Sequence, residues 1–367
     1  MDCLGLSKQK FHIHNKDSTS DSIVVFLRTL KTTQDAVLKI STASTKYDNS
    51  LEVEREVYNL VKTKLSKWSP HFLIPLHSGH CSDDEVVAMR NSKKKWEREM
   101  YEQWIMLRNT AIEKELKDKG TSWGELLSGL PSNVNKKSEM DVGKYLLQKH
   151  TVWKNKFRQM WFVLTPHLKD EPLNVFFSKL KRKLPTSSVR AIAIQLAQAL
   201  SVFALHHVMS NDLHFGNVFI QTLNKPQTIE YTFPRKCTIK SKYFLTIYDF
   251  DRSYVEGGTK NTSLEPNPYF ESLCKQYGEC NKYFPKTDWY SVLTSLVYFT
   301  QNEDIEDVLK NMYQEVEHLS IGKDAAFSRA CTCQKLDPKK RVCLKCKPKS
   351  LSRLITPRTY FLRNTDC

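Results

Sequence analysis

The chain has 367 residues, of which 40% are hydrophobic, and its 56 Lys and Arg against 40 Asp and Glu give a net charge of +16. This composition supports a sizeable core in one or two domains and favours acidic partners such as phosphates, nucleic acid or an anionic surface. No apolar run is long enough to span a bilayer and the first residues lack a signal peptide's apolar core, so we expect an intracellular protein without a membrane span. The ten cysteines are then expected as free or metal-bound thiols rather than disulfides.

Two strands are predicted after a polar turn near the start, in the apolar runs IVVFL and AVLKI. The second carries Lys39 between apolar residues, and a lysine among buried side chains requires an anionic partner. Residues 50–65 have the apolar period of a helix. We expect Glu54 to pair with Lys39, because it lies one turn before the core-facing Tyr58, and Glu56 is the alternative.

Two further strands are predicted at Phe72–Cys81 and Met160–Leu168. Residues 82 to about 156 between them are rich in lysine and glutamate and mostly helical, and we interpret them as an insertion of about 70 residues. An apolar stripe along the insertion is interpreted as core or docking surface rather than as a cofactor site. The stripe consists of Trp96, Met100, Trp104, Leu107, Ala111 and Leu116.

Two acidic motifs follow the long apolar helix predicted from about residue 187. NDLHFGN places Asp212 five residues before Asn217, and YDFD sets Asp249 at the end of a predicted strand, after a hairpin-like extension. Phosphoryl transfer requires a carboxylate that accepts the proton of the attacking hydroxyl and oxygen ligands for Mg²⁺. The three residues, in this order and spacing, fit that division of roles.

The tail contains two close cysteine pairs separated by a basic loop: Cys331 and Cys333, then Cys343 and Cys346. Four thiols this close together match a four-thiolate Zn²⁺ site in number, although C-x-C is tighter than the usual C-x-x-C. Both interpretations stay open, a zinc site and four free thiols in a loosely packed end.

The acidic motifs resemble those of the protein kinase family: NDLHFGN is similar to H-R-D-L-x-x-x-N, YDFD to D-F-G, and AVLKI to V-A-I-K. The resemblance implies that Asp212 is the catalytic base, that Asn217 and Asp249 hold Mg²⁺, and that Lys39 contacts the α- and β-phosphates of ATP. It also implies that Asp288 anchors the catalytic loop. The remaining residues that the resemblance assigns to the ATP site are Glu54, Ser18, Ser20, Val24, Thr165 and His167, with the backbone of residues 165–167 meeting the adenine.

The chain departs from the family at several positions. Residues 18–22 contain no glycine where the family has G-x-G-x-x-G, Ser210 and Asn211 replace His and Arg, and Asp251 replaces the glycine of D-F-G. His214 stands where serine/threonine kinases carry lysine. The nearest overall resemblance is to the divergent serine/threonine kinases of large DNA viruses, of poxvirus and iridovirus type, which implies a place in the host cytoplasm or the virion. The catalytic loop is also similar to those of haspin and aminoglycoside phosphotransferases.

The expected fold is α+β and two-lobed, with a small lobe at 1–167 that includes the insertion, a large lobe at 168–325 and a Cys-rich basic tail at 326–367. The expected function is a serine/threonine protein kinase that moves the γ-phosphate of ATP to a protein hydroxyl. Two alternatives stay open: a small-molecule phosphotransferase of the aminoglycoside or choline kinase type, and a non-catalytic kinase-like binding protein. The substrate and the oligomeric state are not predicted.

Overall fold

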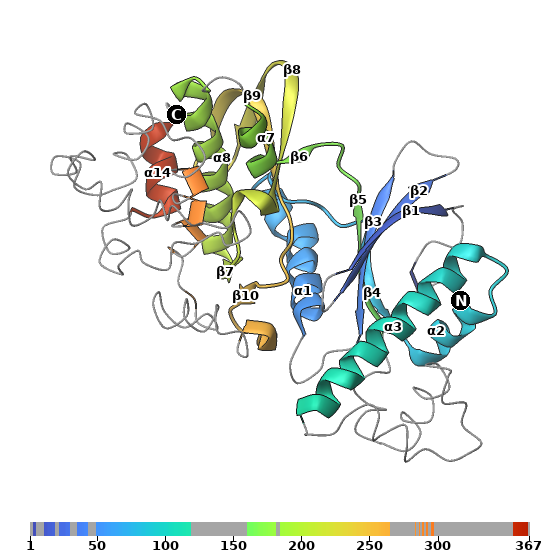
Figure 1. Ribbon diagram of the computed structural model, residues 1–367. Helices are drawn as coiled ribbons and strands as arrows, with labels where there is room; N and C mark the ends of the chain where they lie inside the picture. The colour runs from blue at the N-terminus through green and yellow to red at the C-terminus, as the bar shows by residue number, and fades with distance from the viewer. Residues whose placement is uncertain are drawn as a thin grey trace, which may run out of the picture. The chain divides into compact units, whose positions relative to one another are not determined.

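The computed structural model describes residues 3–4, 11–18, 22–29, 35–42, 49–118, 160–180, 184–264, 283, 286, 288–289, 291–292, 295–296 and 355–365. The chain divides into two compact units (Figure 1). Unit 1 comprises Met1–Arg55 and Pro75–His167, and unit 2 comprises Glu56–Ile74 and Leu168–Cys367.

Unit 1 is built on a five-stranded sheet with the order β1-β2-β3-β5-β4, in which every neighbouring pair is antiparallel. Its strands are β1 (Phe11–Ser18), β2 (Ile23–Thr29), β3 (Ala36–Thr42), β4 (His77–Cys81) and β5 (Met160–Pro166). Burial alternates along β2 and β3: Val25 and Leu38 are fully buried, whereas Val24 and Lys39 are partly exposed. This period of two means that the two strands bury one face of the sheet.

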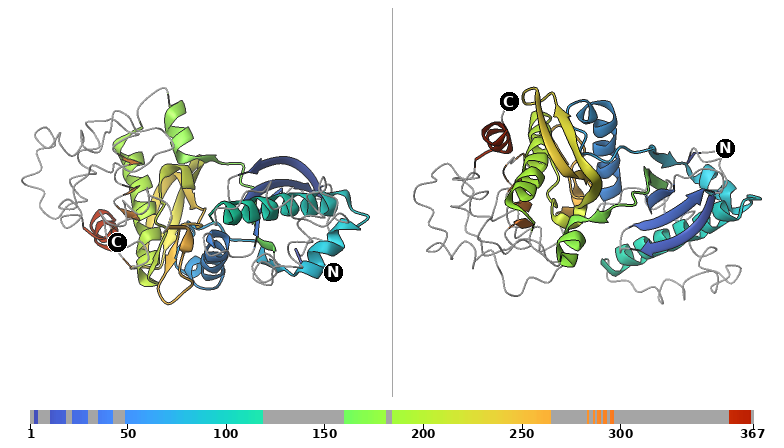
Figure 2. Two further views of the ribbon diagram at one scale, coloured as in Figure 1. Left: turned by 60° about the horizontal axis from the view of Figure 1, so that its bottom comes forward. Right: turned by 90° about the horizontal axis from the view of Figure 1, so that it is seen from above.

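That buried face packs against two helices of the predicted insertion, α2 (Asp83–Arg90) and α3 (Lys95–Asp118), which lie along the sheet (Figures 1 and 2). Trp96, Met100, Trp104 and Leu107 of the stripe are buried in one cluster with side chains of β2, β3 and β5. The interpretation of these four as core is therefore confirmed. The side chains of Ala111 and Leu116 lie outside the described part of the chain.

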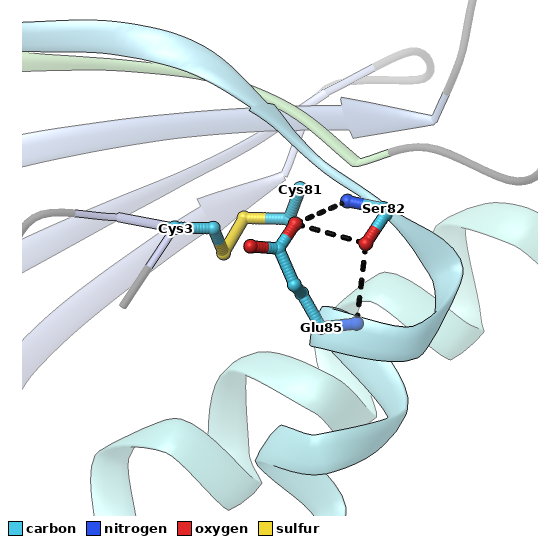
Figure 3. The surroundings of a disulfide bond; sticks show 4 residues. All are labelled: Cys3, Cys81, Ser82 and Glu85. Carbon is cyan, nitrogen blue, oxygen red and sulfur yellow. Dashed lines mark hydrogen bonds between the residues drawn. A yellow bond between two sulfur atoms is a disulfide. The ribbon is translucent and has the colours of Figure 1, made fainter. Parts of the chain in front are cut away.

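The end of β4, just before α2, is tied to the N-terminal segment by a disulfide between Cys3 and Cys81, with the two Cα atoms 5.4 Å apart (Figure 3). Ser82, the next residue, caps the helix: its hydroxyl accepts from the N–H of Glu85, whose carboxylate accepts from the Ser82 N–H. Cys237 in unit 2 is disulfide-bonded too. The expectation of free or metal-bound thiols is wrong for these three cysteines; for Cys3 and Cys81 the fold brings together sulfurs that are 78 residues apart in the sequence.

Two strand predictions need correction. β1 was not expected, because FHIHNKDS lacks a clear alternation; the strand forms as an edge strand by backbone pairing with β2, with a bulge between Ile13 and Asn15. The strand predicted at Phe72–Cys81 begins only at His77, after Pro75. Phe72 instead bridges to Ile247 in unit 2.

Unit 2 takes up the last two turns of α1 (Ser50–Thr63), the helix predicted at 50–65, whose first residues belong to unit 1. Its other helices are α7 (Leu173–Lys179), α8 (Thr186–Leu205) and α14 (Pro357–Asn364), and its short 3-10 helices are η1 (Leu65–Lys67), η2 (Phe215–Asn217) and η3 (Thr262–Leu264). Its strands are β6 (Glu171–Pro172), β7 (Val208–Met209), β8 (Val218–Tyr231), β9 (Cys237–Ile247) and β10 (Tyr254–Val255). The long hairpin β8–β9 confirms the expected extension and packs against α8 (Figure 2).

Helix α8 forms the centre of unit 2. In the part of the chain that the structure describes, α8 alone has the length and hydropathy of a membrane-spanning helix, and 72% of that window is buried inside the protein. Residues 192–203 are buried without a break, among them Gln195 and Gln198. Gln195 accepts from the N–H of Leu245 and donates to the carbonyl of Tyr243, so that a buried amide fastens β9 to the helix.

The end of the tail packs on the same helix. α14 contacts α8, and its Phe361 and Tyr360 are fully buried, edge-to-face on Tyr231 and tilted on Trp289 respectively. Arg235 donates to the carbonyl of Thr365 at 2.8 Å. Residues 355–365 are therefore part of unit 2, and the loosely packed end that was one of the two interpretations of the tail is not observed there.

His71 gives unit 2 a pH-dependent stability. Its ring is buried, Nδ1 donates to the Leu245 carbonyl at 2.9 Å, and Nε2 accepts from the Tyr231 hydroxyl at 2.8 Å. Burial lowers the pKa of His71 from 6.5 to about 4, against the raising effect of the Leu245 carbonyl. Because the folded protein holds a neutral imidazole, this contribution to stability is present above pH 6.5 and is lost as the pH falls toward 4.

We therefore expect the wild type to lose about 2 kcal/mol of unfolding free energy, relative to His71→Gln, between pH 7 and pH 4.5. Urea denaturation of both proteins at the two pH values measures this difference. Other titrating groups are common to both proteins and cancel in the comparison. Parallel losses in the two proteins would mean that His71 is not held neutral by the fold.

Candidate active site

The first group of candidate residues lies in unit 1. Lys39 on β3 forms an ion pair with Glu54 of α1, with Nζ 2.8 Å from Oε2, and the two side chains are only 16% and 4% exposed. A pair this buried is held by α1, which is also fastened to β5 by Arg55 lying 4.3 Å over the ring of Trp161. The structure thus gives the partner of Lys39 as Glu54 and not Glu56.

The register of the sheet puts several of the predicted ATP contacts on the face that carries Lys39. Val24 of β2 lies directly opposite Lys39. Val37 lies two residues before Lys39 on β3, and Thr165 of β5 lies opposite Val37. Because side chains alternate between faces, Val24, Val37, Lys39 and Thr165 share one face, opposite to the one that α2 and α3 bury. Partly exposed valines beside a lysine suit an aromatic base and its phosphates.

The end of β5 differs in detail from the expectation. The N–H of His167 donates to the Asp35 carbonyl at 2.9 Å, and therefore this N–H is not the one that meets the adenine. The carbonyl of Leu164 accepts from the N–H of Leu76, on the side of β5 that faces away from β3. In an antiparallel strand the carbonyl of Pro166, two residues on, points the same way as that of Leu164. In residues 165–167 the Pro166 carbonyl is thus the backbone group that faces away from β3.

Of the residues that replace the glycine-rich loop, the structure describes Ser18 and Ser22. Ser18 ends β1 opposite Ile23. Ser20 lies outside the described residues, so the expected contact of this serine with phosphate stays a prediction.

The second group lies in unit 2, around the catalytic-loop motif. The amide nitrogen of Asn217 donates to the backbone carbonyl of Asp212 at 3.0 Å and so closes the loop between them. Asn217 is 5% exposed, whereas the side chain of Asp212 is 32% exposed. The loop is therefore closed by a buried side chain, that of Asn217, while the carboxylate of Asp212 reaches solvent.

The hairpin brings Asn217 beside Asp249. Val218 pairs with Ile247, and the N–H of Tyr248 donates to the Asn217 carbonyl at 3.2 Å, so that Asp249 is the next residue along. The Tyr248 hydroxyl also donates to the Gly216 carbonyl at 2.6 Å. Sequence reasoning missed Tyr248, because nothing in its spacing marks it, yet it fastens the two motifs together.

Asp249 itself is held in an uncommon backbone conformation. Its φ is +64°, in the left-handed region that Asp tolerates better than most residues. The following Phe250 is fully buried, with its ring 5.0 Å from Tyr58 and 5.9 Å from Phe203. Such a conformation persists only where the surroundings impose it, and it is a frequent mark of functional sites.

The donor atoms at this end of the hairpin fit Mg²⁺. Because its nitrogen donates to Asp212, the amide of Asn217 can offer its oxygen to a metal, and Asp249, which follows Tyr248 in the hairpin register, can offer a carboxylate. Within the ranges that the structure describes, no three His, Cys, Asp or Glu residues form a metal cluster. One carboxylate and one amide are enough for Mg²⁺ when nucleotide phosphates and water supply the other oxygens. The four tail cysteines proposed for Zn²⁺ lie outside the described residues.

Asp288 anchors the catalytic loop from a buried position. Its carboxylate accepts from the N–H groups of Ser210 at 2.7 Å and Asn211 at 2.9 Å, and the residue is 3% exposed. Burial raises the pKa of Asp288 to about 6, while the two backbone donors lower it. Asn211 has a φ of +58° and its amide donates to the Arg252 carbonyl, which explains an asparagine where the kinase motif has arginine.

We expect Asp288→Ala to lower the free energy of unfolding by about 3 kcal/mol, since two buried backbone N–H groups would lose a charged acceptor. Asp288→Asn should lose less, because its amide oxygen still accepts from one of them. Urea denaturation of the three proteins at pH 7 measures both values. A wild-type stability for Asp288→Ala would contradict the anchoring role.

His214 adds a further polar group to the loop. It is 3% exposed, and its Nδ1 accepts from the N–H of Gly216 at 2.8 Å. Its Nε2 therefore carries the proton in the neutral ring, and it lies 3.9 Å from Oδ2 of Asp212. This distance is too long for a hydrogen bond.

The comparisons with known proteins give only distant structural similarities. No protein-family model and no curated protein matches the chain. Similar solved structures include a kinase domain of Plasmodium, at 10% identity and a TM-score of 0.40, covering 83% of this chain and 70% of that one. A second is the PknI kinase domain of Mycobacterium tuberculosis, at 9% identity and a TM-score of 0.40, covering 97% of this chain and 95% of that one. A third is WaaP in complex with acyl carrier protein, at 11% identity and a TM-score of 0.39, covering 81% of this chain and 78% of that one.

Because these TM-scores lie below 0.5, the fold is assigned from its own elements. A sheet of order β1-β2-β3-β5-β4 carries Lys39 on β3, ion-paired to a helix glutamate. In unit 2 a buried helix leads to the Asp212 loop, followed by the hairpin and then by Asp249. The α+β, kinase-like fold that the sequence predicts is confirmed.

Proposed function

We propose that the protein is an ATP-dependent phosphotransferase of the protein kinase type, directed to serine or threonine hydroxyls of a protein substrate. The observation that carries the proposal is the junction of the catalytic loop and the hairpin in unit 2. There Asn217 fastens the loop of Asp212 and lies next to Asp249 in the hairpin register. A binding protein without catalysis has no chemical need for these three side chains in this arrangement.

Each residue has one role in the proposed reaction. Asp212 orients the acceptor hydroxyl and takes its proton, and its partly exposed carboxylate can reach an acceptor. Asn217 and Asp249 would hold Mg²⁺, which neutralises charge on the phosphate oxygens when it is bound. Lys39, oriented by Glu54, would contact the α- and β-phosphates, and the sheet face of Val24 and Thr165 would receive the base.

The test is phosphoryl transfer by the purified protein from γ-labelled ATP with Mg²⁺. Acceptors are an acidic protein, a basic protein, aminoglycosides and choline, each assayed separately, with Asp249→Asn as the inactive control. We expect label on serine or threonine of a protein acceptor, lost when Mg²⁺ is chelated. Label on choline or an aminoglycoside alone would make the protein a small-molecule phosphotransferase, and nucleotide binding without any transfer would make it a binding protein.

A further inference from the structure

Glu56, the unused alternative partner of Lys39, contacts the segment that follows Asp249. Its carboxylate accepts from the backbone N–H of Thr259 at 2.9 Å, and both residues belong to unit 2. Glu54 and Glu56 are two positions apart on α1, about 200° around the helix, so they face different partners. Glu54 forms the buried salt bridge with Lys39, and Glu56 contacts the turn at residues 256–259.

The turn is shaped around this carboxylate. Gly257 has a φ of +73°, which favours glycine, and Gly258 lies against Glu56 so closely that a Cβ at this position would overlap Oε1 of Glu56. The same Cβ would come to 3.0 Å from Cβ of Val255. Two adjacent glycines thus let the backbone approach the glutamate.

Other contacts hold the rest of the segment. β10 pairs with β7, the strand that directly precedes the catalytic loop, with Tyr254 opposite Met209. The N–H of Glu256 donates to the His207 carbonyl at 3.1 Å. Asn261, 1% exposed, donates from its amide to the carbonyls of Asp251 and Ser253. Residues 251–261 are therefore fastened at several points by groups of the chain itself.

We propose that Glu56 is a positioning residue for the reaction: its carboxylate fixes the turn at 257–259 and with it the segment that begins at Asp249. The inference rests on the proposed function. In kinases whose catalytic loop carries arginine, a phosphate group orders this segment. Here Asn211 replaces that arginine, and an internal carboxylate does the fastening, so that transfer requires no phosphorylation of residues 250–264.

The first test is hydrogen exchange of the full, unphosphorylated protein without nucleotide. Glu56→Ala should raise the exchange rate of amides at 257–261 about tenfold or more, because the Thr259 N–H loses its acceptor. Glu56→Gln keeps an acceptor oxygen and should restore most of the protection. Glu52→Ala, an acidic residue of the same helix outside this contact, is the matched control and should exchange like the wild type.

A second test uses the sterics of Gly258. Gly258→Ala should raise exchange at the turn by pushing the Glu56 carboxylate aside. In the Glu56→Ala background the same substitution should have a clearly smaller effect, since the overlapping oxygen is gone. Additive effects of the two substitutions would contradict a direct contact.

The third test is kinetic. Glu56→Ala should lower kcat about tenfold with the KM for ATP within about twofold, and Glu56→Gln should recover most of the loss. Protein freed of phosphate by a phosphatase should keep its full rate. Exchange in Glu56→Ala equal to that in Glu52→Ala would overturn the proposal even if the protein transfers phosphate. If the wild type transfers no phosphate at all, the exchange result still decides whether Glu56 holds the segment.

Discussion

Asp249→Asn is expected to reduce phosphoryl transfer by at least roughly 10³-fold, since it removes the carboxylate that would hold Mg²⁺ against the nucleotide phosphates. Asparagine is the better substitution because residue 249 has a φ of +64°, a conformation that asparagine tolerates better than alanine. Asp249→Ala should therefore be as inactive and also less stable, by about 1 kcal/mol.

Assays with γ-labelled ATP over a range of Mg²⁺ concentrations measure this effect. The unfolding free energy of Asp249→Asn should match that of the wild type, because Phe250 keeps the next position buried. The matched control is Asp84→Asn, the same change at an exposed position of α2, which should leave the rate unaltered. Near-wild-type activity of Asp249→Asn would refute the assignment of the metal site.

The parts of the site that the sequence predicts are those whose geometry is local. Asp212 and Asn217 are five residues apart, and a single hydrogen bond between them closes the loop. Lys39 is predicted as a lysine on a buried strand, and the period of the following helix favours Glu54 as its partner, with Glu56 as the alternative; in the structure the ion pair is with Glu54. Local periodicity and spacing supply these candidates, and the choice between Glu54 and Glu56 depends on how α1 packs against β3.

The contacts that the sequence could not predict join residues far apart in the chain. The pairing of Cys3 with Cys81, of Glu56 with the Thr259 N–H, and of α14 with α8 depends on how the elements pack. The sequence does not predict β1 for a related reason. This edge strand forms through its backbone pairing with β2 and has no clear alternation of apolar and polar residues.

The packing of the insertion against the sheet is also a long-range contact that the sequence does not predict. The sequence predicts its apolar stripe as core or docking surface, and the four described members of the stripe are core, but the stretch is predicted as an addition to the small lobe. In unit 1 the side chains of α2 and α3 instead fill one cluster with β2, β3 and β5, including Leu38 beside the candidate Lys39. The helices are thus the layer that covers the back of the sheet whose other face carries the candidate site.

Asp212→Asn is expected to lower kcat by roughly two or more orders of magnitude, with little change in the KM for ATP. The substitution keeps the size of the side chain, and the backbone carbonyl of residue 212 can still accept from Asn217. What is lost is the carboxylate that takes the proton of the acceptor hydroxyl. An amide can orient that hydroxyl but has too little basicity to receive the proton.

Steady-state kinetics with the acceptor found for the wild type separates these effects. A fall in kcat with unchanged nucleotide affinity indicates a lost base, whereas a rise in the KM for the acceptor alone indicates lost orientation. Asp212→Ala removes both functions and should be slower than Asp212→Asn. Because Asp288 and Asn217 hold the loop through groups other than the Asp212 side chain, both variants should fold normally. A kcat unchanged in Asp212→Asn would require the base to be a different residue.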